Sequence, residues 1–135
     1  MTQSTNLAME HLALNIPAAG RMAEWYCKNL DMKIVRSFDL FETTFLADAS
    51  GRVVLELYSN PELPMLDHAA IHPSTLHIAF VVSDIATTRD RLAAAGATVV
   101  QNIFTTSAGD EMMMLKDPWG VTLQFIRRAK PMLKL

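Results

Sequence analysis

The chain has 135 residues, half of them hydrophobic, and a formal net charge of -2 at pH 7. It can therefore bury the core of one domain, but its mixed charges lack the one-signed field that nucleic acid or an anionic membrane surface requires. Its single cysteine, Cys27, excludes an internal disulfide framework, and no stretch has the pattern of a signal peptide or a membrane span, so we expect a cytoplasmic protein.

The first half of the sequence predicts a strand, a helix and then three strands. Residues 8–16 form an apolar run that Pro17 ends, and apolar residues then recur at helical spacing as far as Leu30. A turn at Gly51 separates the last two of the strands that follow. These strands are predicted over residues 32–38, 43–49 and 52–59.

The second half repeats this order after a connector. Residues 60–74 are rich in proline and acidic residues, which is typical of a segment that crosses between two units. A strand over residues 76–82 is followed by a helix that Ser83 or Asp84 caps and Gly96 ends. Three more strands are predicted over residues 97–104, 111–117 and 120–128.

The two halves align with each other, which indicates an internal duplication. The segment that begins at His11 matches the one that begins at His77, and Leu55-Glu56-Leu57 matches Leu123-Gln124-Phe125. We therefore predict an α+β fold in which two tandem βαβββ modules each curve a mixed sheet into a half-barrel. Residues 1–135 would form a single domain, with modules over about 8–59 and 75–128 and a connector over 60–74.

Four polar side chains interrupt apolar strands at matched positions of the two halves. They are His11, Glu56, His77 and Gln124. Taken singly, each fits a solvent-exposed position or a hydrogen-bonded core residue. Taken together, two imidazoles and one or two oxygens at equivalent strand positions favour a shared site for a divalent cation.

The chain resembles the vicinal oxygen chelate superfamily. The resemblance is carried by the strand EHLALNI, the segment WYCKNLDMKIV, the strands VVLELY and LHIAFVV, and the final DPWGVTLQFI, in this order over residues 8–127. This superfamily includes glyoxalase I, extradiol dioxygenases, fosfomycin-modifying enzymes and bleomycin-resistance proteins. Its enzymes take their metal ligands from the first and last strands of each module, which by motif are His11, Glu56, His77 and Gln124.

The resemblance implies a glyoxalase-like, metal-dependent lyase or isomerase that acts on a small oxygen-chelating substrate through a stabilised enediolate or enolate. A glutathione hemithioacetal is one candidate substrate. The family's glyoxalases carry a glutamate where this chain has Gln124, and an amide cannot act as a base. Glu56 is then the expected acid/base and also a ligand. The ligand set suits Ni, Co, Zn, Mn or Fe.

The resemblance also leaves a second class of function open. Bleomycin-resistance members bind a drug or metabolite in a groove between subunits without a metal, and this chain is an alternative candidate for such a binding protein. In either class, a chain of two modules is expected to form a homodimer. The two connector histidines, His68 and His72, could reach the mouth of a substrate site, but we interpret them as solvated loop residues.

Overall fold

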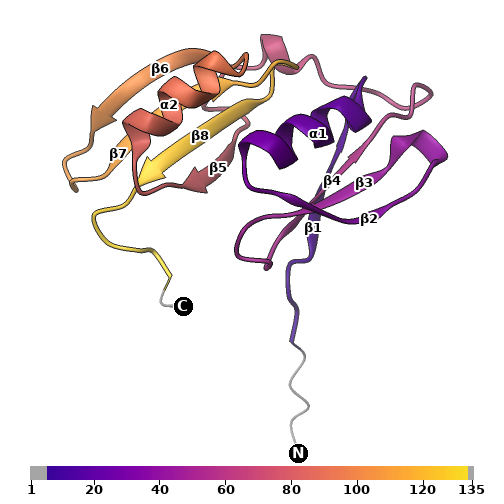
Figure 1. Cartoon of the computed structure of the whole chain (residues 1–135), viewed down its shortest axis with the longest axis horizontal. Coiled ribbons are helices and arrows are strands. Elements are labelled where there is room, and N and C mark those ends of the chain that lie inside the picture. Colours follow the sequence, from indigo (N-terminus) through magenta and orange to yellow (C-terminus); the bar gives the residue numbers. More distant parts are fainter. Residues whose placement is uncertain (1–5, 134–135) are drawn as a thin grey trace, which may run out of the picture. The chain divides into compact units, whose positions relative to one another are not determined.

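The computed structural model describes residues 6–133 and divides the chain into two compact units, residues 1–66 and 67–135. Each unit contains one α-helix and one four-stranded mixed sheet, and neither sheet closes on itself (Figure 1). The predicted α+β fold of two βαβββ modules is therefore confirmed. Neither helix, α1 (Ala19–Asn29) or α2 (Ile85–Ala94), has the length and apolar character needed to cross a membrane, and residues 6–133 hold no other candidate.

The first unit has the strand order β1-β4-β3-β2. β1 is parallel to β4, and the other neighbouring pairs are antiparallel. Two parallel strands need a long connection, and here the helix and the hairpin of β2 and β3 lie between β1 and β4 in the chain. The elements are β1 (His11–Asn15), α1 (Ala19–Asn29), β2 (Lys33–Ser37), the 3-10 turn η1 (Leu40–Glu42), β3 (Thr44–Ala47) and β4 (Val54–Tyr58).

Helix α1 is amphipathic and packs on one face of this sheet (Figure 1). Met22 and Tyr26 are completely buried, as their helical spacing predicts. The helix lacks a capping side chain of its own at its first turn, and the Ser59 hydroxyl accepts a hydrogen bond from the Ala19 N–H instead. It ends before Asp31, whose φ of 54° turns the chain into β2.

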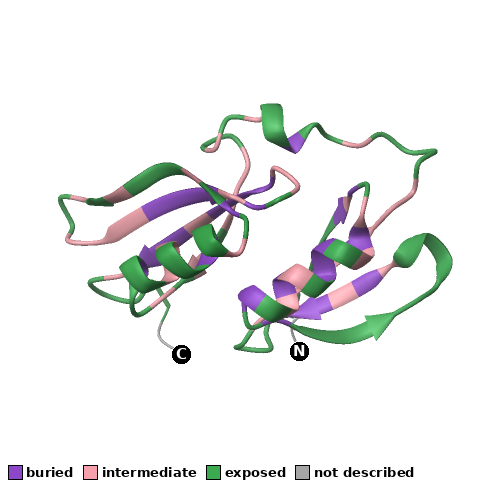
Figure 2. Ribbon diagram, turned by 45° about the horizontal axis from the view of Figure 1, so that its top comes forward, coloured by how far each residue is buried: buried purple, intermediate pink, exposed green. Residues whose placement is uncertain are grey.

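The two faces of the first sheet differ in character. Leu55 and Leu57 of β4 are buried with exposed fractions of 6% and 0%, whereas Glu56 between them is only partly buried. Alternation along the strand therefore places Glu56 on the face opposite the buried leucines. We call this the open face of the first sheet. The edge strand β2 is exposed along its whole length (Figure 2).

The second unit repeats the topology, with the strand order β5-β8-β7-β6. Asp84 caps α2, since its side chain accepts a hydrogen bond from the Thr87 N–H, and Gly96 with a φ of 108° follows the helix, as predicted. The elements are the 3-10 turn η2 (His68–Ala70), β5 (Ile78–Val81), α2 (Ile85–Ala94), β6 (Thr98–Thr105), β7 (Glu111–Lys116) and β8 (Thr122–Arg127).

The turn η2 is tied to the second sheet by Lys116. The Nζ atom donates hydrogen bonds to the carbonyl oxygens of His68, Ala69 and Ile71 at 2.8, 3.1 and 3.0 Å. Because the ammonium group has three donors, these carbonyls satisfy it fully. The interpretation of His68 as a solvated loop residue is wrong, since its exposed fraction is 7%.

The strand registers confirm the alignment of the two halves. Glu56 lies opposite Ala13 of β1, and Gln124 lies opposite Ala79 of β5. Each sheet also has a register shift at the same point. The pairing skips Val35, which follows Ile34 in β2, and it skips Val100, which follows Val99 in β6. The duplication therefore extends to an irregularity that alternating hydrophobicity does not reveal.

Candidate metal-binding residues

His11 and Glu56 come together on the open face of the first sheet. His11 begins β1 two residues before Ala13, which is paired with Glu56. Because β1 and β4 are parallel neighbours, the two side chains lie diagonally on the same face. The His11 Nε2 atom is 3.3 Å from the Glu56 Oε1 atom, and the two side chains are 36% and 20% exposed. Both remain accessible to a small ligand.

This separation fits two ligands of one divalent ion. Histidine nitrogen and carboxylate oxygen each lie about 2.1 Å from a zinc-like ion, so neighbouring ligands are roughly 3.0–3.4 Å apart. The other ring nitrogen of His11, Nδ1, is 2.9 Å from the Glu10 carboxylate. A carboxylate accepts a hydrogen bond from Nδ1–H, and in the neutral ring the lone pair is then on Nε2, the nitrogen that faces Glu56.

His77 shows the same arrangement in the second unit. Its Nδ1 atom lies 2.9 Å from the carbonyl oxygen of Pro73. A carbonyl can only accept, so Nδ1 carries a proton, and in the neutral ring Nε2 keeps the lone pair that a metal requires. The ring is partly buried. The two histidines are thus held by the same nitrogen with different oxygen acceptors.

Gln124 lies on the same face of the second sheet as His77. It is opposite Ala79, and His77 stands two residues before Ala79, just ahead of β5. This is the relation that Glu56 has to His11 in the first unit. Gln124 is partly exposed, and its amide oxygen is a neutral ligand atom for a hard or borderline cation.

Each unit contributes two of the four predicted ligands. The described residues contain no group of three or more His, Cys, Asp or Glu side chains that could hold a metal ion. A structural zinc site needs about four protein ligands and a catalytic one about three. The sharing of one ion by His11, Glu56, His77 and Gln124 therefore stays a prediction.

Sequence reasoning missed the neighbours of the His11–Glu56 pair. The Phe45 ring packs edge-on against the His11 ring with a centroid separation of 5.7 Å, and Phe38 packs edge-on against Phe45 at 6.3 Å. Arg36 is paired with Phe45 across the sheet. The register shift in β2 puts Arg36 at this position, and the one-in-two pattern of a regular strand gives no signal for it.

His68 and Cys27 have altered proton affinities. Burial lowers the pKa of His68, while the neighbouring Asp117 carboxylate acts against this effect. Burial raises the pKa of the Cys27 thiol, and a backbone hydrogen bond from Ile34 only partly offsets it. Because the thiolate is the reactive form of cysteine, Cys27 is a poor nucleophile, as its sequence context predicts.

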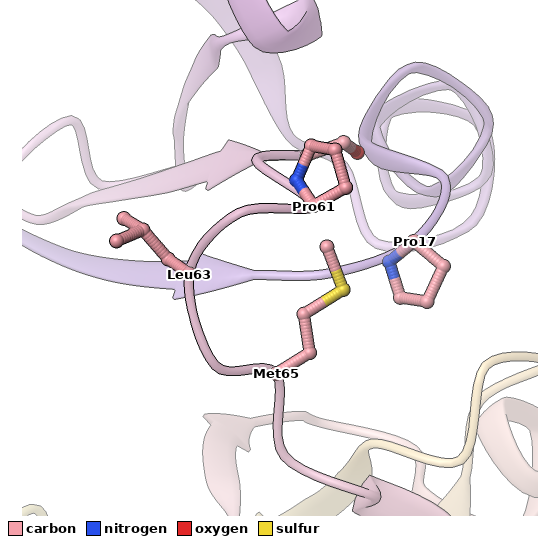
Figure 3. Close-up of a pocket in the computed structure, with 5 residues that line it drawn as sticks. Pro17, Pro61, Leu63 and Met65 are labelled. Atoms are coloured by element: carbon pink, nitrogen blue, oxygen red, sulfur yellow. The ribbon is translucent and has the colours of Figure 1, made fainter.

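An open pocket of about 560 Å³ lies in the first unit, away from these residues. Figure 3 shows the Met65 side chain pointing toward Pro17 and Pro61. The pocket adjoins the carboxyl end of β1, whereas His11 begins that strand, so the two places are separated by roughly 20 Å of extended chain. It is lined by Pro17, Ser59, Pro61, Leu63 and Met65.

Solved structures of similar fold are numerous. A glyoxalase family protein from Bacillus cereus aligns with a TM-score of 0.78 at 14% identity, over 94% of this chain and 97% of its own. A glyoxalase/bleomycin resistance protein/dioxygenase family enzyme from Burkholderia phytofirmans PsJN gives a TM-score of 0.71 at 13% identity, over 90% and 98% of the two chains. A glyoxalase I mutant from Zea mays gives 0.73 at 20% identity, over 91% of this chain and 46% of its own.

No curated protein matches the chain in sequence. The family model that does match is described as the Glyoxalase/Bleomycin resistance protein/Dioxygenase superfamily and covers residues 8–125. This range includes the first module, all but the last residues of the second, and all four predicted ligands. The chain belongs to this superfamily, the vicinal oxygen chelate superfamily that its motifs resemble.

Proposed function

We propose that the chain is a metal-dependent lyase or isomerase that acts on a small substrate with two neighbouring oxygens. His11, Glu56, His77 and Gln124 would hold the ion. The observation that carries this proposal is the His11–Glu56 pair, in which Nε2 faces a carboxylate oxygen at 3.3 Å while Nδ1 is engaged by Glu10. His77, with its Nδ1 engaged by a carbonyl, supports the second half of the set.

The charges of the four groups favour this chemistry. Two neutral imidazoles, one carboxylate and one amide would leave a divalent ion with a net charge near +1. Such an ion supplies Lewis acidity, which stabilises negative charge that develops on substrate oxygens when a neighbouring proton is removed. The residues of the chain hold the ion and orient the oxygens.

Glu56 is the residue that we assign to proton transfer. It is the only carboxylate in the proposed set, and the amide of Gln124 cannot accept a proton at neutral pH. One carboxylate oxygen of Glu56 lies near His11, and the side chain keeps 20% of its surface exposed, so it has access to a substrate on the open face. Glu56 would take the proton from the hydroxyl-bearing carbon next to the carbonyl and return it to the former carbonyl carbon, while the hydroxyl proton passes to the former carbonyl oxygen.

Hydrogen exchange at carbon tests this function directly. We expect the metal-loaded protein to exchange the α-protons of a hydroxyketone probe such as hydroxyacetone, or to convert the hemithioacetal of glutathione and methylglyoxal, in deuterated buffer observed by NMR. Both EDTA and the Glu56→Gln substitution should abolish exchange. Full exchange in the Glu56→Gln variant would remove Glu56 from this role.

Gln124 also favours a second candidate, a metal-free protein that binds a drug or metabolite. A neutral amide at this position weakens a cation site but does no harm to a groove for an organic ligand. EDTA separates the two functions. A lowered melting temperature in EDTA supports the metal-dependent enzyme, whereas ligand binding and thermal stability that EDTA leaves unchanged support the binding protein.

A further inference from the structure

A row of unlike side chains crosses the open face of the first sheet. Glu56 of β4 is paired with Phe45 of β3, and Phe45 is paired with Arg36 of β2. Paired residues of adjacent strands point to the same face, so a carboxylate, a ring and a guanidinium follow one another. Adjacent strands lie about 4.8 Å apart, which puts roughly 10 Å between the Glu56 and Arg36 positions. With Phe38 beside Phe45, we call these residues the recognition row.

The equivalent row of the second sheet is uncharged. Gln124 is paired with Met114, and Met114 with Gln101. The backbone arrangement is the same, including the register shift that precedes Arg36 and Gln101. The architecture alone does not require an aromatic or a charged side chain at these two positions, so Phe45 and Arg36 are particular to the first half of the chain, whereas the exposed Phe104 stands where Phe38 stands.

The rings of the recognition row are incompletely covered within their own unit. Phe38 is 53% exposed and Phe45 is partly exposed, although both are aromatic. Their edge-on contacts, with Phe45 between His11 and Phe38, form a ladder that starts at the proposed metal ligands. Exposed rings beside a polar pair are typical of a ligand site, because ligand atoms can pack against them there.

Arg36 gives the outer end of the row a charge preference. The residue is exposed, and among residues 6–133 it has no ion-pair partner. A guanidinium group binds carboxylates through parallel hydrogen bonds. A ligand anchored at Glu56 and packed on Phe45 would therefore meet a cation at its far end.

We propose that the recognition row selects substrates with an aromatic middle and an anionic far end, joined to the oxygen-chelating head. This inference rests on the proposed function for the position of the head, and it adds the class of the rest of the molecule. The Phe45 and Phe38 rings bind the aromatic group, and Arg36 binds the anion.

A series of three hydroxamates tests the proposal by calorimetry, in the presence of Ni²⁺ and again in EDTA. Acetohydroxamate carries only the chelating head, benzohydroxamate adds a ring, and 4-(carboxymethyl)benzohydroxamate adds an anion. We expect the ring to tighten binding at least about fivefold and the carboxylate to add a further factor of about three.

Substitutions assign each gain to its residue. Phe38→Ala should remove most of the gain from the ring, and Phe45→Met, which copies Met114 of the other half, should reduce it. Arg36→Gln, which copies Gln101, should remove the gain from the carboxylate. Arg52→Gln is the matched control, because it removes the same charge from an exposed turn outside the row and should leave all three affinities unchanged.

Two failures are distinguishable in this design. If Ni²⁺ changes the affinity for none of the hydroxamates, the metal site of the proposed function is contradicted. The gains from the ring and the carboxylate, measured in EDTA, then still test the recognition row. If neither the ring nor the carboxylate improves binding in either buffer, or if their gains persist in Phe38→Ala and Arg36→Gln, the recognition row is overturned.

Discussion

Two histidines in this chain are held by the same ring nitrogen in unrelated ways. Nδ1 of His11 faces the Glu10 carboxylate, and Nδ1 of His77 faces the Pro73 carbonyl. In the neutral ring, both arrangements leave the lone pair on Nε2, which is the state that a metal ligand needs. The positions of the two histidines could be predicted from the sequence. The hydrogen bond between His77 and the Pro73 carbonyl could not be predicted, because a backbone carbonyl belongs to every residue and gives no sequence signal.

The single departure from the family's ligand pattern gives a test at residue scale. We expect Gln124→Glu to bind a divalent ion at least about tenfold more tightly, because it adds a negative charge to the proposed site. Titration with Co²⁺ or Ni²⁺ measures the change. Gln101→Glu is the charge control, since Gln101 lies two strands from Gln124 on the same face. Equal gains in the two variants would show a nonspecific charge effect.

His68 gives the chain a predicted dependence of stability on pH. Burial lowers its pKa below the ordinary value of 6.5, so the unfolded chain binds more protons than the folded chain over the interval between the two pKa values. The free energy of unfolding should therefore fall as the pH decreases below about 6.5 and should level off above it. Urea unfolding at several pH values measures this slope.

The His68→Gln substitution should flatten that slope. His72→Gln is the matched control, because His72 lies in the same segment with an exposed side chain, and this variant should keep the slope of the parent. A slope that survives in His68→Gln would assign the pH dependence to another group.

At the scale of elements, the regular pieces of the fold could be predicted and the irregular ones could not. Alternating and helical patterns located all eight strands and both helices of the described residues to within a few positions. The short turns η1 and η2 and the register shifts in β2 and β6 follow from packing and twist, for which the sequence has no periodic signal. The recognition row depends on one of these shifts.

The turn before β8 shows how closely η2 is packed. A Cβ atom on Gly120 would lie 2.7 Å from the Ala69 nitrogen and 2.9 Å from the Ala69 Cα, and the φ of Gly120 is +88°. We expect Gly120→Ala to lower the free energy of unfolding by at least about 2 kcal/mol, through steric conflict added to left-handed strain.

Gly51 provides the control for this prediction. It has a φ of +72° in the β3–β4 turn, but a Cβ atom there would meet nothing within 4 Å. Gly51→Ala should therefore cost only about 1 kcal/mol, the strain without the clash. Chemical denaturation of both variants measures the difference. Equal losses would mean that the η2 contact contributes nothing beyond backbone strain.

At the scale of the whole molecule, the duplication divides the predicted ligands equally between the two units. His11 and Glu56 belong to the first unit, and His77 and Gln124 to the second. The fold class and the matched positions were predictable from the sequence, because they repeat within it. No local sequence pattern predicts which assembly would bring His11 and Glu56 to His77 and Gln124. We propose the homodimer that the resemblance implies.

Complementation in a mixed dimer tests whether each site is completed by both subunits. We expect His11→Ala and His77→Ala chains each to bind no metal alone, and a purified heterodimer of the two to bind one ion. This result follows because one of its two shared sites keeps both histidines, whereas sites formed within single chains would all lack one. A heterodimer without metal, or a chain that sediments as a monomer at micromolar concentration, would contradict the shared dimeric site.

We propose that imidazoles from both halves of the chain bind one divalent ion. The most direct measurement is metal content per chain, determined by elemental analysis after loading and exhaustive dialysis, for the parent protein and for the His11→Ala/His77→Ala double variant. We predict one ion per chain in the parent and close to none in the double variant, with both proteins folded by circular dichroism. Stoichiometric metal retained in the double variant would show that the ion is held elsewhere and would contradict the proposed site.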